Sequence, residues 1–331
     1  MSVCCVLVTY GDRIHLLEDV VHALLKQDVK RIVVVDNGSA PSSRDGLERL
    51  RSLFPDKFRT VHLPENTGSA KGYKSGLQEA YSCGDCEFIW LLDDDNLPAG
   101  DALRVLLDNW NSLCGESYTA NVALVSLRKD RKPFADISRG VPVNKWFGRQ
   151  NSFLGFHILD LPSIVLRRIL RRERRSSGKH VGRAVIPFAP YGGLFFHRSL
   201  LERIGYPSED FFLYHDDFEF TYRVTALSGK IYLISGSVVE DIDSPWHKSH
   251  FSYKISYLHD GDDSRVYYVV RNRVYLERYC LKYDNPIWRM NMMIYLNIMR
   301  YVALLTGVKQ RFDIIDKAVR DGADGKLGRY E

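Results

Sequence analysis

The sequence lacks several features that would assign it to a well-known class. No basic segment followed by an apolar run and a small-residue cleavage site precedes the first predicted strand, so we expect a cytoplasmic protein. It has no internal repeat and no low-complexity tract. Apolar residues make up 45% and charged residues 26%, which is ordinary for a globular chain and argues against a fibrous or wholly disordered one.

A disulfide pattern and a strong net charge are also missing. Two of the six cysteines, Cys4 and Cys5, lie inside an apolar run, which favours a reducing compartment. Cys83 and Cys86 have the spacing of a metal knuckle or redox pair, but no second pair accompanies them, so we interpret them as loop residues. The net charge of +5 is too small to indicate nucleic acid, and no nucleic-acid-binding motif is present.

No apolar stretch is clean enough to predict a membrane span. Residues Met290 to Val308 would form a helix about 28 Å long, close to the thickness of a bilayer. However, Asn291, Asn297 and Arg300 interrupt it, and a charge at mid-bilayer costs at least a few kcal/mol. We expect an amphipathic helix that packs on the rest of the protein, and binding at a membrane interface is the alternative.

The first hundred residues alternate between strand and helix patterns. Val3–Thr9, Arg31–Val35 and Phe88–Leu92 are short apolar runs typical of buried strands, and helical periodicity separates them. The alternation predicts a parallel sheet flanked by helices. Because ligands bind beyond the carboxyl ends of such strands, we expect the polar residues there to converge on one crevice. These residues are Thr9, Tyr10, Asp36, Asn37 and the triplet Asp93, Asp94 and Asp95.

Glycine is scarce at the turn where a dinucleotide would need it. The residues after the first strand are Thr9-Tyr10-Gly11-Asp12, without the three glycines that let a backbone approach a pyrophosphate. A sugar-nucleotide pyrophosphorylase would carry a Gly-rich, Arg- or Lys-containing signature at this turn, and none is present. A bound diphosphate therefore needs another source of positive charge.

The triplet Asp93 to Asp95 could supply that charge by holding a metal ion. In an extended chain Asp93 and Asp95 point one way and Asp94 the other. Two carboxylates about 4 Å apart repel by roughly 4 kcal/mol at an effective dielectric near 20, so they need a cation, a shared proton or full solvation. Mg²⁺ or Mn²⁺, held by one or two carboxylates and by phosphate oxygens, satisfies this need. The alternative is a solvated acidic turn that caps a helix starting near Pro98.

A second acidic segment, His215 to Arg223, has the pattern of a helix. Asp216 and Asp217 would lie in its first turn, where the helix dipole favours their ionised form. A positioned carboxylate of this kind can take a proton from a hydroxyl nucleophile. The alternative is that both residues only cap the helix.

Residues 130 to 190 form the least regular part of the sequence. Six arginines lie between Arg167 and Arg175, and we expect a mobile insertion there. The cluster could hold anionic lipid headgroups or a diphosphate-lipid acceptor, at about 1 kcal/mol per basic residue near a charged surface. A solvated loop is the alternative.

These motifs in this order resemble family-2 glycosyltransferases, which are inverting enzymes with the GT-A fold. The resemblance covers most of the chain and rests on Val8-Thr9-Tyr10, Val35 to Ser39, Glu65 to Gly72, Asp93 to Asp95, Gly192-Gly193 and His215-Asp216-Asp217. It implies that Asp36 contacts the nucleoside, that Asp93 and Asp95 bind Mn²⁺ or Mg²⁺, and that Asp217 is the base. The family usually has Glu-Asp where this chain has Asp216-Asp217, so Asp216 also stays a candidate base.

The same resemblance implies a donor site for a nucleoside-diphosphate sugar. Its expected residues are Thr9, Tyr10, Asp36, Asn37, Asn66, Lys71, Asp94, Gly192 and Gly193.

A narrower similarity is to bacterial galactofuranosyl- and rhamnosyltransferases. It rests on Trp90 to Asp95, Trp246-His247, Tyr267-Tyr268-Val-Val-Arg271-Asn272 and the ending Arg320 to Gly328. It implies a UDP-galactofuranose or dTDP-rhamnose donor and a carbohydrate or lipid-linked glycan acceptor in surface polysaccharide synthesis. It also implies His247 as a further metal ligand, whereas spacing alone favours an exposed loop histidine.

We therefore predict a GT-A catalytic domain over residues 1–255 and a helical extension over 256–331. The catalytic domain would hold a nucleotide-binding half at about 1–125, the mobile Arg-rich insertion at about 160–183 and an acceptor half at about 185–255. The alternative function is a catalytically silent protein that binds sugar nucleotides or polysaccharide at the membrane. No pattern in the sequence indicates an oligomeric state.

Overall fold

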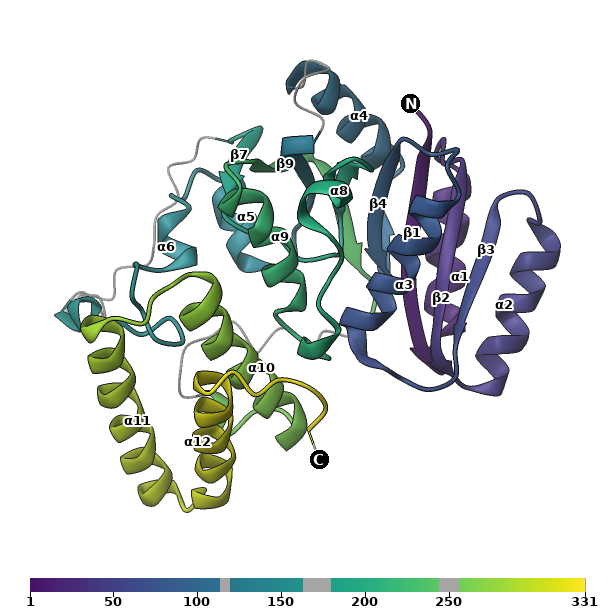
Figure 1. The fold of residues 1–331 in the computed structure, drawn as a ribbon. Helices are drawn as coiled ribbons and strands as arrows, with labels where there is room; N and C mark the ends of the chain where they lie inside the picture. The colour runs from purple at the N-terminus through teal and green to yellow at the C-terminus, as the bar shows by residue number, and fades with distance from the viewer. Residues whose placement is uncertain (114–119, 163–179, 244–255, 331) are drawn as a thin grey trace. The chain divides into compact units, whose positions relative to one another are not determined.

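The chain forms two compact units. The computed structural model describes residues 1–113, 120–162, 180–243 and 256–330 (Figure 1). Unit 1 comprises Met1–Gly140, Lys179–Phe212 and Asp216–Pro245, and unit 2 comprises Val141–Gly178, Leu213–His215 and Trp246–Glu331. The domain boundaries expected from the sequence stay a prediction.

Unit 1 is built on one mixed sheet. Its strands are β1 (Val3–Gly11), β2 (Arg31–Ser39), β3 (Phe58–Leu63), β4 (Phe88–Asp93), β5 (Asn96–Pro98), β6 (Val122–Arg128), β7 (Arg183–Ile186), β8 (Leu194–His197) and β9 (Lys230–Asp241). Eight of them lie in the order β3-β2-β1-β4-β8-β6-β9-β5, and β7 pairs with β9. β3, β2, β1 and β4 run parallel, and β8 is antiparallel to both of its neighbours. The α/β fold predicted from strand and helix alternation is confirmed.

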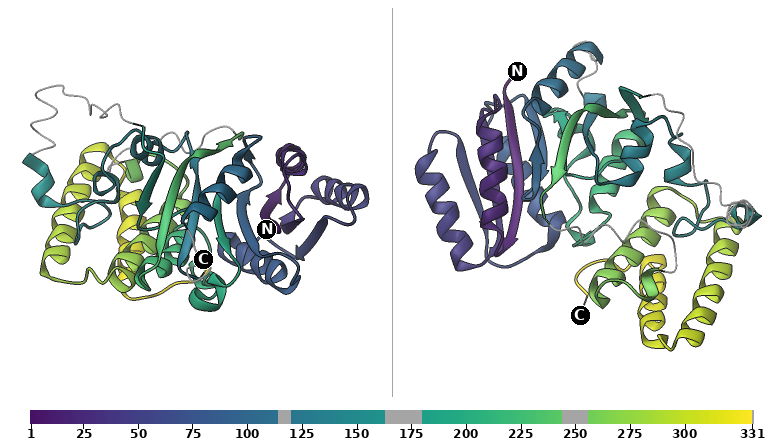
Figure 2. Two further views of the ribbon diagram at one scale, coloured as in Figure 1. Left: turned by 90° about the horizontal axis from the view of Figure 1, so that it is seen from above. Right: turned by 180° about the vertical axis from the view of Figure 1, so that it is seen from behind.

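Helices cover both faces of this sheet (Figures 1 and 2). They are α1 (Ile14–Leu25), α2 (Pro41–Leu53), α3 (Gly68–Ser82), α4 (Ala102–Leu113), α5 (Lys132–Ser138), α8 (Leu200–Ile204) and α9 (Asp216–Ala226), with a 3-10 turn η3 (Glu209–Phe211). Alternate β1 residues Val3, Cys5 and Leu7 share one apolar core with α1, α2 and α4. The intervening residues face α3, because an extended strand points successive side chains to opposite sides.

Helix α3 lies unusually close to the sheet because two of its inward positions are glycines. A Cβ at Gly72 would lie 2.8 Å from Val8 Cγ1, and a Cβ at Gly76 would lie 2.5 Å from Val6 Cγ1 and 2.9 Å from Val35 Cγ2. No side chain larger than hydrogen fits between α3 and these strands. The glycines thereby set the position of the α3 residues that reach the strand ends.

Unit 2 is helical in its described part. Its elements are α6 (Asn144–Phe147), η2 (Ile158–Asp160), η5 (Ser256–Leu258), α10 (Asp263–Tyr275), η6 (Leu276–Cys280), α11 (Pro286–Thr306) and α12 (Lys309–Ala323). Helix α11 starts with Pro286 at its first position, after the Asn285 side chain, which accepts hydrogen bonds from the N–H groups of Ile287 and Trp288. Helix α11 also has no acidic residue. In the part of the chain that the structure describes, no helix is both long and apolar enough to cross a membrane.

The Tyr267-Tyr268-Val-Val-Arg271-Asn272 motif holds unit 2 together. Arg271 donates to the Gly328 carbonyl at 2.6 Å, and its Nε donates to Asn272 Oδ1 at 2.8 Å. Asn272 Nδ2 lies 2.8 Å from the carbonyl oxygens of both Leu213 and Tyr214, next to two residues, Tyr214 and His215, that have left-handed φ angles of 65° and 61°. The motif thus supplies buried side chains that bond to the backbone and stabilise the strained loop at Tyr214 and His215.

We predict that Gly76→Ala destabilises the protein, because the added methyl group overlaps two valines of the sheet. The free energy of unfolding should fall by about 1–3 kcal/mol, even though alanine favours a helix more than glycine does. Urea denaturation measures the change. Gly100→Ala is the matched control, since its Cβ would meet nothing within 4 Å and should change stability by less than about 0.5 kcal/mol. Equal stability of the two variants would contradict the close approach of α3.

Candidate functional site

The described residues that are expected to form a site lie in unit 1, at the ends of β1, β2 and β4, around the start of α3, just before β8 and at the start of α9. The parallel register pairs Thr9 with Asp36 and Val8 with Asp93, so three strands deliver their polar residues to one edge. This register is the arrangement that the strand and helix alternation predicted. The catalytic and binding roles of these residues stay predictions.

The carboxylate of Asp94 binds other side chains of the protein. Thr9 Oγ1 donates to Asp94 Oδ2 at 2.7 Å, and Arg13 donates to both carboxylate oxygens at 2.9 to 3.0 Å. The Asp94 side chain is only 4% exposed, and burial raises its pKa although Arg13 and Thr9 oppose the rise. Asp94 therefore ties the end of β1 to the end of β4. Next to it Tyr10 is exposed, with the Arg13 guanidinium 5.3 Å from its ring centre.

Asp93 and Asp95 reach different cations. The Tyr73 hydroxyl donates to Asp93 Oδ1 at 2.6 Å, and Arg128 Nη1 lies 3.2 Å from Asp93 Oδ2. Asp95 instead accepts from Arg13 Nη2 at 2.9 Å, as Asp94 does. Strict alternation along the triplet does not hold, because β4 ends at Asp93 and the chain turns there. The Asp93 side chain is 39% exposed, so it is the most open of the three.

Negative charge exceeds positive charge around this turn. The carboxylates are those of Asp93, Asp94, Asp95, Asp130, Asp241 and Asp243, and the guanidinium groups that they share are those of Arg13, Arg128 and Arg131. Burial, followed by the charges of Asp93, Asp94 and Asp241, raises the pKa of Asp95 to about 7. Burial acts against ionisation of Asp241 too, but the charges of Arg128 and Arg131 lower its pKa.

A divalent cation fits this surplus of negative charge. Among the described residues no group of three or more histidine, cysteine or acidic side chains is arranged to hold a metal ion. Two carboxylates are nevertheless enough for Mg²⁺ or Mn²⁺ when substrate phosphates and water complete the shell. Asp93 offers an open carboxylate, and a nearby cation would remove the repulsion that raises the Asp95 pKa. His247, the third predicted ligand, lies outside the described residues, as does the Arg167–Arg175 cluster.

Gly192 and Gly193 let the backbone pass against the acidic turn. A Cβ at Gly192 would lie 2.8 Å from Asp93 Oδ2 and would overlap both Arg128 Nη1 and Asn96 Oδ1. Gly193 has a φ of +95°, and its N–H donates to the Leu91 carbonyl at 2.8 Å. The two glycines therefore leave room for the ion pair of Asp93 with Arg128, and the Gly193 N–H bonds to β4.

Asp36 is fully buried at the end of β2. Its Oδ1 accepts the Ser39 N–H at 2.7 Å, and its Oδ2 lies 3.2 Å from Arg44 Nε and 3.1 Å from His62 Nδ1. Burial acts to raise its pKa, but the Ser39 hydrogen bonds, His62 and Arg44 lower it below the usual carboxyl value. Asp36 is therefore an ionised group whose described partners shape the loop after β2.

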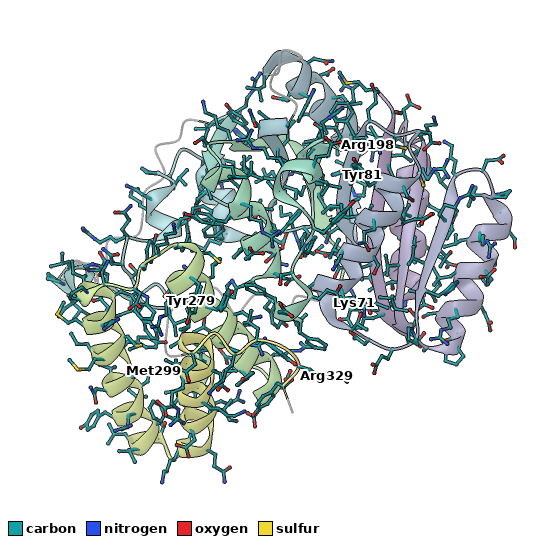
Figure 3. The ribbon with its side chains drawn as sticks, in the orientation of Figure 1. Lys71, Tyr81, Arg198, Tyr279, Met299 and Arg329 are labelled. Carbon is teal, nitrogen blue, oxygen red and sulfur yellow. The ribbon has the colours of Figure 1, made fainter. Side chains whose placement is uncertain are left out.

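Asn37 joins that loop to the start of α3. Its Oδ1 accepts from the Thr67 N–H and hydroxyl at 2.9 Å, and its Nδ2 donates to the Gly68 carbonyl at 3.0 Å. Asn66 belongs to the same network, since its Oδ1 accepts the Gly68 N–H at 3.0 Å. Lys71 lies one turn further along α3, where its Nζ is 3.7 Å from Glu209 (Figure 3).

The second acidic pair opens α9. The Ser69 hydroxyl donates to Asp216 Oδ2 at 2.8 Å, and burial raises the Asp216 pKa to about 6. Asp217 is partly exposed, and its Oδ1 accepts the Phe218 N–H at 2.8 Å. Burial and then the charge of Asp216 raise the Asp217 pKa well above that of an ordinary carboxyl. The negative charge of Asp93 adds to this shift, so Asp93 and Asp217 lie within electrostatic range of one another.

Two tyrosines fill the space between the two acidic pairs. Tyr73 donates to Asp93, and its ring centre lies 4.0 Å from that of Tyr191. The charges of Asp216 and Asp217 raise the pKa of Tyr191, after burial, so its hydroxyl is near the start of α9. The buried residues Tyr73, Tyr191 and Asp216 thus connect the partly exposed Asp93 at the end of β4 to the start of α9.

Sequence reasoning missed the groups that balance the acidic turn. Arg13 follows β1, Arg128 ends β6 within a short basic segment, and the partners of both are distant in sequence. Tyr73 reads as one more residue of a helix, and Asp241 as the end of a strand. Only their position in the sequence could have identified these residues. Each lies at or next to the carboxyl end of a strand or about one turn from the start of a helix.

Comparison with known proteins gives relatives in structure. GalNAc-T7, solved with UDP, GalNAc and Mn²⁺, aligns over 98% of this chain with a TM-score of 0.57 and 14% identity. The alignment spans only 56% of the GalNAc-T7 chain. The mannosyltransferase PcManGT from Pyrobaculum calidifontis, solved with GDP-Man and Mn²⁺, aligns over 98% of this chain and 87% of its own, with a TM-score of 0.50 and 18% identity.

These likenesses show a GT-A-like fold. No curated protein sequence matches the chain. The sequence model described as glycosyl transferase family 2 matches residues 4–205, which is more than half of the chain and contains β1 through α8. The chain therefore belongs to glycosyl transferase family 2.

Proposed function

We propose that this protein is an inverting glycosyltransferase that moves a sugar from a nucleoside diphosphate to a carbohydrate hydroxyl group. The observation that carries the proposal is that two acidic centres of unit 1, Asp93–Asp95 and Asp216–Asp217, are connected through the buried side chains of Tyr73 and Tyr191. One centre suits a cation that faces a diphosphate, and the other suits a proton acceptor. Such a division of roles is what direct displacement of a nucleoside diphosphate requires.

In this proposal Asp93 and Asp95 hold Mn²⁺ or Mg²⁺, which neutralises charge on the departing diphosphate. Arg128 and Arg13 fix the two carboxylates in place through the ion pairs at 3.2 and 2.9 Å. Tyr73 adds a hydrogen bond to Asp93 that orients the carboxylate further. Both structural relatives were solved with Mn²⁺, which supports this choice of ion.

Asp217 is our choice for the base. As a residue Asp217 is partly exposed, whereas Asp216 is buried and accepts a hydrogen bond from Ser69. The raised pKa of Asp217 makes it a stronger proton acceptor than an ordinary carboxylate once it is ionised. Asp216 then acts on Asp217 through its charge and through the shape of the first turn of α9.

For the donor we propose a nucleotide-linked hexose, with UDP-galactofuranose or dTDP-rhamnose as the specific candidates. UDP with GalNAc and GDP-Man in the two structural relatives support the class of donor. The narrower choice rests on the sequence motifs alone. The proposed acceptor is a glycan or lipid-linked glycan of a bacterial surface polysaccharide. The candidate residues around the donor stay Thr9, Tyr10, Asp36, Asn37, Asn66, Lys71, Asp94, Gly192 and Gly193.

We propose a cytoplasmic location. The cysteines Cys4, Cys5, Cys83, Cys86 and Cys280 are all free in the structure. Free thiols in this number suit a reducing compartment. Peripheral attachment to a membrane is compatible with that location.

A donor screen tests the proposed activity. Purified protein would be incubated with a panel of sugar nucleotides, Mn²⁺ or Mg²⁺ and carbohydrate acceptors, and release of the nucleoside diphosphate would be measured. We expect release with at least one donor. Tight donor binding without any turnover would instead support the alternative, a catalytically silent sugar-nucleotide or polysaccharide-binding protein.

Removal of the metal ion should abolish turnover. EDTA should stop diphosphate release, and added Mn²⁺ should restore it, because two carboxylates and a diphosphate lose their shared cation. The double variant Asp93→Asn with Asp95→Asn should bind UDP and Mn²⁺ together more weakly, as measured by titration calorimetry. Asp101→Asn changes an exposed aspartate directly before α4 and is the control, which should behave as wild type. Full activity in EDTA would refute a metal role.

Asp217→Asn should lower kcat by about 10²- to 10⁴-fold, because the amide cannot accept the proton of the acceptor hydroxyl. Donor and metal affinity should stay close to wild type. Asp210→Asn replaces an exposed aspartate shortly before α9 and serves as the matched control. If Asp217→Asn kept full kcat while Asp216→Asn lost it, the base would be Asp216.

The dependence of kcat/KM on pH should reflect the raised pKa of Asp217. A base must be ionised, so kcat/KM should rise with pH through a pKa above that of an ordinary carboxyl. Asp216→Asn removes a neighbouring negative charge and should move this acidic limb to lower pH. An unmoved limb in Asp216→Asn would show that another group governs the profile. Circular dichroism across the same pH range separates this shift from unfolding.

Gly192→Ala should disturb the Asp93 ion pairs without a general loss of fold. The new Cβ would overlap Arg128 Nη1 and Asn96 Oδ1 and press on Asp93 Oδ2, so turnover should fall by about 100-fold. Gly182→Ala is the control, because its Cβ would meet nothing within 4 Å. Wild-type turnover in Gly192→Ala would mean that the arrangement around Asp93 is not needed for activity.

A further inference from the structure

Helix α11 of unit 2 is apolar on two opposite faces. Its inner face consists of Trp288, Asn291, Tyr295, Met299 and Ala303, which are all buried. Met299, labelled in Figure 3, is fully buried on the side of α11 toward α12. An ordinary surface helix would carry charged and polar residues on the opposite side.

The opposite face of α11 instead exposes large apolar side chains. They are Ile287 (46% exposed), Met290 (39%), Met293 (59%), Ile298 (39%), Tyr301 (65%), Leu304 (63%) and Leu305 (69%). At about 100° per residue these positions fall in one arc on the side of the helix away from the buried residues. We call this arc the α11 outer face.

The outer face is a concentrated feature and not a scatter of single residues. Half of the large apolar side chains that are exposed in the described part of the chain lie on this one helix. Asn297 is the one polar residue inside the arc, and its Nδ2 donates to the Met293 carbonyl of the same helix at 2.9 Å. A continuous exposed apolar surface of this kind marks a place where a protein meets a partner or a membrane.

The charges along α11 indicate what the partner is. The helix contains two arginines, Arg289 and Arg300, and no acidic residue, and both arginines border the outer face on one side. Lys309, the first residue of α12, lies three residues after the end of α11 and is exposed. An apolar arc bordered by basic residues is the pattern of a helix that lies in the headgroup region of an anionic bilayer.

A second copy of the chain suits the outer face less well. Two copies of α11 packed through this face would bring their Arg300 side chains together, and α11 contains no carboxylate to pair with them, whereas Arg289 already pairs with Asp284 at 2.8 Å. Whole copies also repel, because each has a formal net charge of +5. Anionic lipid offers both the apolar phase and the opposite charge.

We propose that the outer face of α11 binds the surface of an anionic lipid bilayer. The helix would lie parallel to the membrane, with Met293, Tyr301 and Leu304 among the acyl chains and Arg300 at the phosphate level. This surface is separate from the acidic centres of unit 1. It would attach the protein to the phase that holds a lipid-linked acceptor without crossing it.

Vesicle sedimentation of the full chain tests the proposal without any donor or acceptor. We expect the wild-type chain to sediment with vesicles that mix phosphatidylglycerol and phosphatidylcholine, and to stay in solution with phosphatidylcholine alone. The double variant Met293→Glu with Leu304→Glu should bind the anionic vesicles about ten-fold or more weakly, because two apolar anchors become charged. Both side chains are mostly exposed, so the thermal midpoint should stay that of wild type.

The matched control is Leu53→Glu, which places the same charge on an exposed leucine of α2 in unit 1 and should bind vesicles like the wild type. No binding by the wild type, equal binding to neutral vesicles, or equal loss in Leu53→Glu would each overturn the proposal. Light scattering tests whether a second copy binds this face instead. A wild-type chain that forms dimers and does not bind vesicles, and whose dimers dissociate in the double variant Met293→Glu with Leu304→Glu, would assign the face to a second copy and overturn the proposal. Sugar transfer is scored separately, so either proposal can fail alone.

Discussion

The arrangement of the site depends on one electrostatic constraint, which is the surplus of carboxylates around the turn after β4. Arg13 joins Asp94 and Asp95, and Arg128 joins Asp93 to Asp241. The Arg128 side chain is only 3% exposed and that of Arg13 is 17% exposed, so water screens these ion pairs incompletely, and removal of the partners of Arg128 would leave a buried charge. These ion pairs thereby connect the ends of β1, β4, β6 and β9 at the edge of the sheet where the candidate site residues lie.

This constraint explains why the acidic turn is both rigid and incompletely neutralised. The arginines hold the carboxylates in place, yet Asp95 keeps a pKa near 7 because Asp93, Asp94 and Asp241 surround it in a buried position. A protein that needed only a helix cap would gain nothing from such repulsion. A site that is completed by a dication does gain, because the ion relieves the repulsion when it binds.

Much of the fold could be predicted from the sequence, because apolar runs and helical periods are local signals. The run Val3–Thr9 became β1, and the order of strands and helices brought Thr9, Asp36 and Asp93 to one edge. The partners of those residues could not be predicted in the same way. Arg13 binds Asp94 across 81 residues, and no local pattern encodes that distance. Alternation failed at Asp95 because β4 ends at Asp93, and strand ends are set by tertiary contacts.

The motif Tyr267-Tyr268-Val-Val-Arg271-Asn272 bears on how the donor sugar should be inferred. Arg271 and Asn272 are buried in unit 2, and their side chains bond to the backbone of Gly328, Leu213 and Tyr214. Buried side chains that bond to the backbone maintain the fold, and enzymes with different sugar donors can share one fold. Sugar specificity depends instead on side chains that meet the sugar itself. A resemblance carried by this motif therefore supports a shared build of the helical unit more strongly than it supports a galactofuranosyl or rhamnosyl donor.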